Sequence, residues 1–235
     1  MDIVRAVKKD IRHFSDLEKS KILQRFFKTG KGEYGEGDKF MGVKVPESRS
    51  VAVKYFSDAS LGDIEKIIES HFHEDRLTGL IMLVKKFEIA DERDKKKIFE
   101  FYISHVSRIN NWDLVDLTAP NIAGEWLLEK DKKIIYEMAK SKNIWERRIA
   151  IVSTFAFIRK NNFDDTLAIA KILLDDKEDL IHKSVGWMLR EVGKRKEKAL
   201  VDFLEKYSAA MPRTALRYAI ERFNEKRRLS FLKKI

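Results

Sequence analysis

The fold is decided by the stretch RLTGLIMLV, residues 76–84. Its hydrophobic side chains recur at intervals of three and four residues, as on one face of an α-helix. Similar spacing is found in two further sets, Ile64, Ile67, Ile68 and Phe72, and Ile149, Val152, Phe155 and Ala156. No convincing run alternates as a β-strand does. The sequence therefore predicts an all-α chain of about a dozen helices joined by short turns.

The basic residue that opens this stretch, with the small and apolar residues behind it, recurs further along the chain. The related segments are Arg148–Ile151, Lys183–Trp187 and Arg213–Leu216. Their separations are 72, 35 and 30 residues, and the longest gap can hold another unit. A period near 35 with two helices per unit is typical of helical-repeat arrays, although short for the HEAT and armadillo types. We expect one domain over residues 1–235, a curved α-α superhelix of HEAT-like repeats; coincidence among amphipathic helices is the alternative.

The charge of the chain favours a polyanionic partner. The 235 residues include 48 Lys and Arg against 38 Asp and Glu, a net charge of +10. Such an excess is typical of proteins that bind nucleic acid, although a charged helical surface can also carry it without function. Hydrophobic residues make up 44% of the chain, which argues against wholesale disorder.

Several classes of protein are disfavoured by what the sequence lacks. There is no cysteine, so disulfides and thiolate metal sites are excluded. His71 and His73 are two residues apart and cannot face one metal from a helix, so we expect them at a helix end or on the surface. No apolar run reaches the roughly 20 residues of a membrane-spanning helix, and Met1–Arg5 do not resemble a signal peptide. We expect a cytoplasmic protein without metal, cofactor or membrane contact.

Residues 29–46 interrupt the helical pattern. They contain five glycines and end at Pro46, between a helix expected to end near Lys28 and another expected to start near Pro46. A glycine-rich loop can cradle phosphate, but this one lacks the Lys-Ser/Thr ending of a nucleotide-binding loop. We interpret it as a structured connection, with contact to a ligand as the alternative.

Stacked repeats would align basic residues along one wall. The residues expected to form this stripe and contact DNA are Arg76, Arg147 or Arg148, Lys183, Arg190, Arg213 and Arg217. Duplex DNA presents one negative charge every ~1.7 Å of its axis, which such a stripe matches. For any single member, a solvated or intrahelical role is the alternative.

The tryptophans separate into two kinds by their neighbours. Trp126 and Trp145 lie among hydrophobic residues and are expected to pack in the core. Trp187 shares a helix with Lys183 and Arg190, which places its ring on the basic face. Trp112 and Asp116 are four residues apart and so lie on one face of a helix. On this local pattern alone, Asp116 is either a solvated or capping residue or part of a site.

Four segments of the sequence resemble those of a known family. They are Gly35–Pro46, Asn111–Asp116, Trp145–Ile151 and Lys183–Glu191. In this order, over nearly the whole chain, they resemble the AlkD-like DNA alkylation-repair family. The resemblance implies a HEAT-like glycosylase that excises cationic alkylated purines, such as 3-methyladenine and 7-methylguanine, from duplex DNA without flipping the base.

The resemblance also implies roles for individual residues. By motif position, the sugar-contacting tryptophans fall on Trp112 and Trp187, the essential carboxylate on Asp116 and the essential arginine on Arg148. The spacing to the following Ala-Ile favours Arg148 over Arg147. The residue before Trp112 is Asn here and aromatic in some relatives, which leaves its packing open. Asp116 is expected to stabilise an oxocarbenium-like sugar and position water, and the protein to act as a monomer on alkylated double-stranded DNA.

Two other functions remain open from the sequence. A non-catalytic HEAT-repeat protein could bind distorted or branched DNA, which would favour loss of the carboxylate or its partners. A protein-interaction scaffold would carry apolar rather than basic inner positions. The presence of Asp116, Arg148, Trp112 and Trp187 favours the glycosylase.

Overall fold

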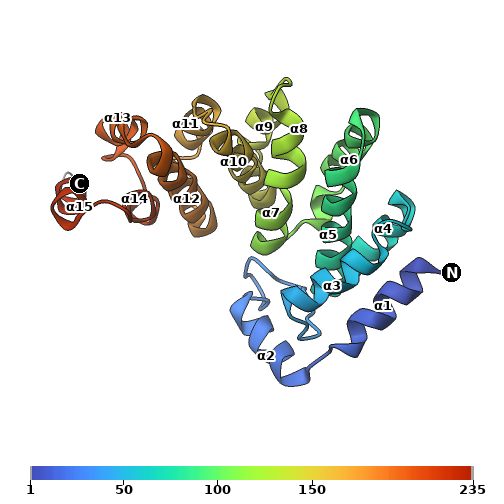
Figure 1. The fold of residues 1–235 in the computed structure, drawn as a ribbon. Helices are drawn as coiled ribbons and strands as arrows, with labels where there is room; N and C mark the ends of the chain where they lie inside the picture. The colour runs from blue at the N-terminus through green and yellow to red at the C-terminus, as the bar shows by residue number, and fades with distance from the viewer. Residues whose placement is uncertain (1, 234–235) are drawn as a thin grey trace. The chain divides into compact units, whose positions relative to one another are not determined.

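The computed structural model describes residues 2–233 and separates into two compact units, Met1–Thr118 (unit 1) and Ala119–Ile235 (unit 2). The described residues form helices and no β-strand, apart from an isolated bridge between Lys39 and Phe72. The prediction of an all-α fold is therefore confirmed (Figure 1). A single domain over residues 1–235 stays a prediction. Within residues 2–233, no helix combines the length and apolarity needed to cross a membrane.

Unit 1 is organised around helix α5 (His73–Ile89). The other helices of this unit are α1 (Ile3–His13), α2 (Leu17–Phe26), α3 (Val45–Tyr55), α4 (Leu61–Ile68), α6 (Glu92–Ser104), the 3-10 turn η1 (Val106–Arg108) and α7 (Trp112–Thr118). Helices α3, α4 and α7 all pack against α5, and every residue from His73 to Val84 is buried. Because α5 is covered on nearly all sides, it contributes more residues to the hydrophobic core of unit 1 than any other helix of that unit.

Unit 2 has two long central helices, α10 (Ile144–Arg159) and α12 (Asp179–Arg195). Its other elements are the π-helical turn η2 (Pro120–Gly124), α8 (Glu125–Leu127), α9 (Lys133–Met138), α11 (Asp164–Ile172), α13 (Glu197–Tyr207), α14 (Arg213–Ala219) and α15 (Glu225–Leu232). Neighbours α10, α12 and α14 pack in sequence, while α11 packs against both α10 and α12, and α13 packs against α12 (Figure 1). This layered stacking of helix pairs is what a helical-repeat array requires.

The four sequence segments of the predicted repeat all lie near the start of a helix. Arg76, Arg148, Lys183 and Arg213 lie in the first turns of α5, α10, α12 and α14. Helix α7, with Trp112, falls in the longest gap between them. The sequence pattern thus located the starts of four helices; their equivalence as repeats stays a prediction.

The glycine-rich loop connects α2 to α3, as predicted. Its turn at Gly42 has a φ of +85°, and a Cβ there would overlap the carbonyl oxygen of Asp16, so glycine is required. The backbone N–H groups of residues 41–43 all donate to the buried carboxylate of Glu74, at 2.8 to 3.2 Å. These amides bind an internal carboxylate, which identifies the loop as a structured connection.

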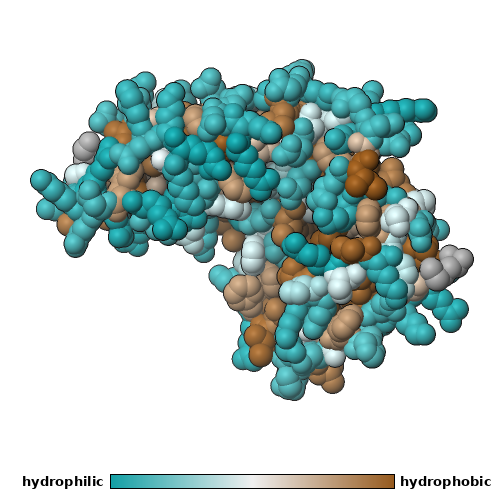
Figure 2. All heavy atoms as spheres, viewed as in Figure 1, coloured by the Kyte–Doolittle hydropathy of each residue, from teal (hydrophilic) through white to brown (hydrophobic). Residues whose placement is uncertain are grey.

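Helix α2 is the least buried helix of unit 1. None of its residues is buried, and Leu17, Ile22 and Phe26 are exposed. Figure 2 shows hydrophobic residues at the surface over this part of unit 1. Phe26 and the following Phe27 bring this helix into contact with Trp112.

Candidate active site

Trp112 and Asp116 lie one turn apart on helix α7, and both are half-buried. The helix begins beside the fully buried Asn111, whose side-chain oxygen accepts from the backbone N–H of Trp112 at 2.8 Å. The amide nitrogen of Asn111 donates to Asp38 at 3.2 Å. Asn111 therefore ties the start of α7 to the glycine-rich loop, which settles the packing that the sequence left open.

A buried hydroxyl chain fixes the other end of α7. Thr118 donates its hydroxyl proton to the carbonyl oxygen of Leu114 at 2.5 Å, so the Tyr102 hydroxyl is the donor in its 2.9 Å bond to Thr118. Burial, and secondarily the negative charge of Asp116, raise the pKa of Tyr102 above its ordinary value. Tyr102 therefore stays a neutral donor, and the turn that carries Asp116 is held at a fixed place on α6.

The ring of Trp112 packs against two phenylalanines from the end of α2. Phe27 stacks on it with 5.3 Å between ring centroids and 16° between planes. Phe26 meets it edge-on at 6.1 Å. Both geometries are favoured by aromatic quadrupoles. The indole is thus held in one orientation.

A buried polar cluster, which the sequence did not reveal, contacts α7 through Asp113. Asp38 accepts from Arg76 at 2.6 Å, and His73 lies between Asp38 and Asp113 at 3.3 and 2.8 Å. All four side chains are buried. His73 is at a helix start, as predicted, but inside the protein, whereas His71 is exposed. Because the partners are 35 to 40 residues apart, no local spacing indicates the cluster.

In unit 2, Arg148 and Arg147 have different surroundings. Arg148 is buried, and its guanidinium donates to the carbonyl oxygen of Leu180 in α12. Arg147 is half-buried; it pairs with Asp176 at 2.6 Å and donates to the carbonyl oxygens of Ser141 and Lys142 at 3.0 Å. Arg147 therefore ties the loop before α10 to the turn before α12.

Trp187 lies on α12, half-buried beside Phe155 of α10, with 5.7 Å between ring centroids. The guanidinium of Arg159 lies 4.4 Å from the ring centroid of Phe155, a cation–π contact. Gly186 allows the close packing behind Trp187, because a Cβ there would overlap the carbonyl oxygen of Ala215 in α14.

The predicted DNA-binding residues differ in accessibility. Arg213 and Arg217 are exposed on α14. Lys183 is half-buried and pairs with Asp179 at 2.6 Å. Arg190 is half-buried between Glu191 and Glu221. All four belong to unit 2, and the two exposed arginines present the most open donors.

Arg76 is placed differently from these four. It is buried within unit 1, donating to Asp38 at 2.6 Å and to the carbonyl oxygen of Ser70 at 3.1 Å. Turning this guanidinium toward a phosphate would leave the buried Asp38 carboxylate without its closest cation, which is costly. We therefore correct the sequence-based expectation and do not retain Arg76 among the proposed DNA contacts.

Of the two tryptophans expected in the core, Trp145 is buried, as predicted. Trp126 is only half-buried, and the ammonium group of Lys130 lies 4.2 Å from its ring centroid. Its ring is therefore shared between core packing and a surface cation–π contact.

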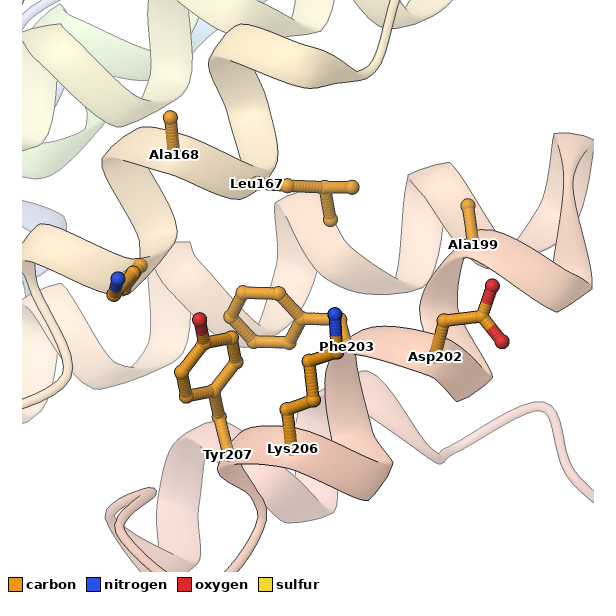
Figure 3. A pocket seen from close by; sticks show the side chains of 8 residues that line it. Leu167, Ala168, Ala199, Asp202, Phe203, Lys206 and Tyr207 are labelled. Carbon is orange, nitrogen blue, oxygen red and sulfur yellow. The ribbon is translucent and has the colours of Figure 1, made fainter.

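A metal site, or a hollow that contains Trp112, Asp116, Arg148 or Trp187, would be a further candidate site in the described residues. No group of three or more His, Cys, Asp or Glu side chains within residues 2–233 is arranged to hold a metal ion. A hollow of about 340 Å³ lies between α11 and α13 and is lined by Lys171, Asp202 and Tyr207 among others (Figure 3). Its carboxylate, Asp202, pairs with Lys198 at 2.8 Å.

The fold of the described residues is that of all-α proteins built from stacked helices. The sequence profile of the family described as DNA alkylation repair enzyme matches residues 7–223. The chain belongs to this family.

Solved structures support the same fold. A predicted DNA alkylation repair enzyme from Enterococcus faecalis aligns with a TM-score of 0.71 at 16% identity, over 90% of this chain and 97% of the other. AlkD2 from Streptococcus mutans aligns with a TM-score of 0.57 at 18% identity, over 88% and 98%. No functionally curated protein matches the sequence.

Proposed function

We propose that this protein is a DNA glycosylase that releases cationic N3- or N7-alkylated purines, such as 3-methyladenine and 7-methylguanine, from duplex DNA. The observation that carries the proposal is the pairing of Trp112 and Asp116 on one turn of α7, in a chain with a net charge of +10. Membership of the DNA alkylation repair family supports DNA as the substrate.

The reaction needs a negative charge more than it needs an acid. Alkylation at N3 or N7 makes the purine cationic and a good leaving group, so the base departs without prior protonation. The deoxyribose is left with positive charge, in a transition state like that of glycoside hydrolysis. Asp116 stabilises this charge and orients the attacking water. At about 4 Å and an effective dielectric near 20, one charge pair contributes roughly 4 kcal/mol.

The remaining members of the proposed site act on the sugar and the backbone. The electron-rich faces of Trp112 and Trp187 favour the cationic sugar by about 1 kcal/mol each. Arg148 holds a phosphate near the lesion, for which its guanidinium must give up part of its bonding to Leu180. Arg147 keeps its structural pairing with Asp176.

Discrimination in this proposal comes from the lesion itself. The resemblance to the AlkD-like family supports release without flipping the base into a pocket, and within residues 2–233 we find no evident set of side chains for reading a base edge. Lability of the cationic base then selects the substrate. The protein is proposed to act as a monomer and without a cofactor.

The test is the variant Asp116→Asn, which removes the charge and keeps the shape of the side chain. We expect release of 7-methylguanine from methylated duplex DNA to fall roughly a hundred- to a thousandfold, while affinity for the duplex is largely retained. Asp175→Asn, which removes the same charge from an exposed turn, should leave the rate unchanged. Near wild-type release by Asp116→Asn would show that the role of Asp116 is wrong.

A further inference from the structure

Four buried charged side chains connect helix α7 to the rest of unit 1. Arg76 and His73 come from α5, Asp38 from the glycine-rich loop and Asp113 from α7 itself. Asn110 and Asn111 donate to the same Asp38 carboxylate at 3.3 and 3.2 Å. Three separate segments therefore meet at one network, and Asp38 and His73 connect them.

The geometry sets the protonation state of His73. Both of its ring nitrogens face carboxylate oxygens, Nδ1 toward Asp38 and Nε2 toward Asp113. An ionised carboxylate only accepts hydrogen bonds, so both nitrogens must donate, and only the imidazolium has two N–H groups. The attraction of Asp113 and Asp38 outweighs desolvation and the repulsion of Arg76, and raises the pKa of His73 to about 9.

From the imidazolium a continuous aromatic stack leads to Trp112. The ring of His73 stacks on Phe40 at 4.6 Å, Phe40 on Phe27 at 4.8 Å and Phe27 on Trp112 at 5.3 Å, with planes within 23° of one another at each step. Asp113, bonded to the same imidazolium, directly follows Trp112 in the chain. His73 thus reaches α7 twice, through a hydrogen bond and through the stack.

We propose that His73 is a positioning residue: its imidazolium ties α7 and the glycine-rich loop to α5, and so fixes the orientation of Trp112 and Asp116. Its effect on base release rests on the function proposed above. Its effect on Trp112 does not.

Deprotonation releases this tie. The groups that face His73 are Asp38 from the loop, Asp113 from α7 and Arg76 from its own helix. A neutral imidazole keeps one N–H, so one carboxylate loses its hydrogen bond from His73 and the buried charges no longer balance. Because the folded-state pKa lies above the ordinary 6.5, the stabilisation is complete below about pH 6.5 and is lost as pH rises through about 9.

The first test follows the near-UV circular dichroism of Trp112, taken as wild type minus Trp112→Phe, while pH is raised to about 10. We expect this signal to be lost with a midpoint near pH 9, while far-UV dichroism is retained. His71→Gln alters an exposed histidine two residues away and should keep the step. His73→Gln should show a weaker signal at neutral pH and no step. A constant wild-type signal through this range overturns the proposal even if the His73 variant fails to fold.

The second test measures single-turnover release of 7-methylguanine at neutral pH. We expect His73→Gln to slow the chemical step about ten- to a hundredfold without changing the Kd for duplex DNA. If wild type releases base and His73→Gln is equally fast, positioning fails and the glycosylase proposal stands. If the dichroism step is present and wild type releases no base, the proposed function fails and the fixing of Trp112 by His73 stands.

Discussion

At the scale of single residues, the surroundings of an arginine decide what it can bind. Arg217 is exposed on α14, whereas Arg76 is buried against Asp38. Both belong to the stripe expected from the sequence, but Arg217 can exchange water for a phosphate oxygen, whereas Arg76 is paired with a buried carboxylate. The positive stripe expected from the sequence is therefore carried, in the described residues, by side chains of unit 2.

Replacing Arg217 by Ala tests the stripe. If Arg217 contacts one phosphate, the log–log dependence of duplex affinity on salt should become shallower by about 0.9. The measurement is a salt titration of binding to unmodified duplex. An unchanged slope would remove Arg217 from the interface.

Arg76→Ala should act on stability instead. It leaves the buried Asp38 carboxylate without its closest cation, which costs about 3–5 kcal/mol for a broken buried pair. Urea denaturation should show this loss, and Arg217→Ala should leave the midpoint almost unchanged. An Arg76 variant as stable as wild type would contradict the structural role assigned to the pair.

At the scale of elements, close packing of α12 on α14 depends on Gly186. A Cβ at this position would overlap the carbonyl oxygen of Ala215 and lie against the Cβ of Tyr218. Since Trp187 is the next residue, any shift of α12 here also moves its ring.

Gly186→Ala should therefore destabilise the protein by about 1–3 kcal/mol, as overpacking does. Gly62→Ala is the matched control, because Gly62 lies on α4 with only the Ser60 hydroxyl near its Cβ position, at 3.8 Å. There alanine should stabilise by up to about 1 kcal/mol through helix propensity. Thermal unfolding of the two variants checks both signs; equal effects would show that packing at Gly186 is not restrictive.

The helices were predictable because hydrophobic spacing is a local property. Periodicity at residues 76–84 found α5, and the repeated basic positions found the starts of α10, α12 and α14. The sequence also placed Trp112 and Asp116 on one helix face. It did not reveal that α5 is covered on nearly all sides, nor the network around His73. Both depend on contacts between distant segments, and a buried histidine has the same local pattern as an exposed one.

At the scale of the whole molecule, two properties are proposed to combine. A net charge of +10 holds DNA without reading its sequence, and one carboxylate stabilises the sugar that turns positive. With Arg76 excluded, about five phosphate contacts remain proposed, which would give a log–log salt slope near −4.5. Binding and selection are then separate, because charge binds any duplex while only a cationic base leaves readily.

The most direct measurement compares base release from two duplexes of the same sequence, one with a single 7-methylguanine and one with the uncharged lesion O6-methylguanine. We expect the wild-type protein to release 7-methylguanine well above its spontaneous rate and to leave O6-methylguanine in place. Release of 7-methylguanine no faster than without protein, from a duplex shown to be bound, would contradict glycosylase activity and identify a non-catalytic DNA-binding protein.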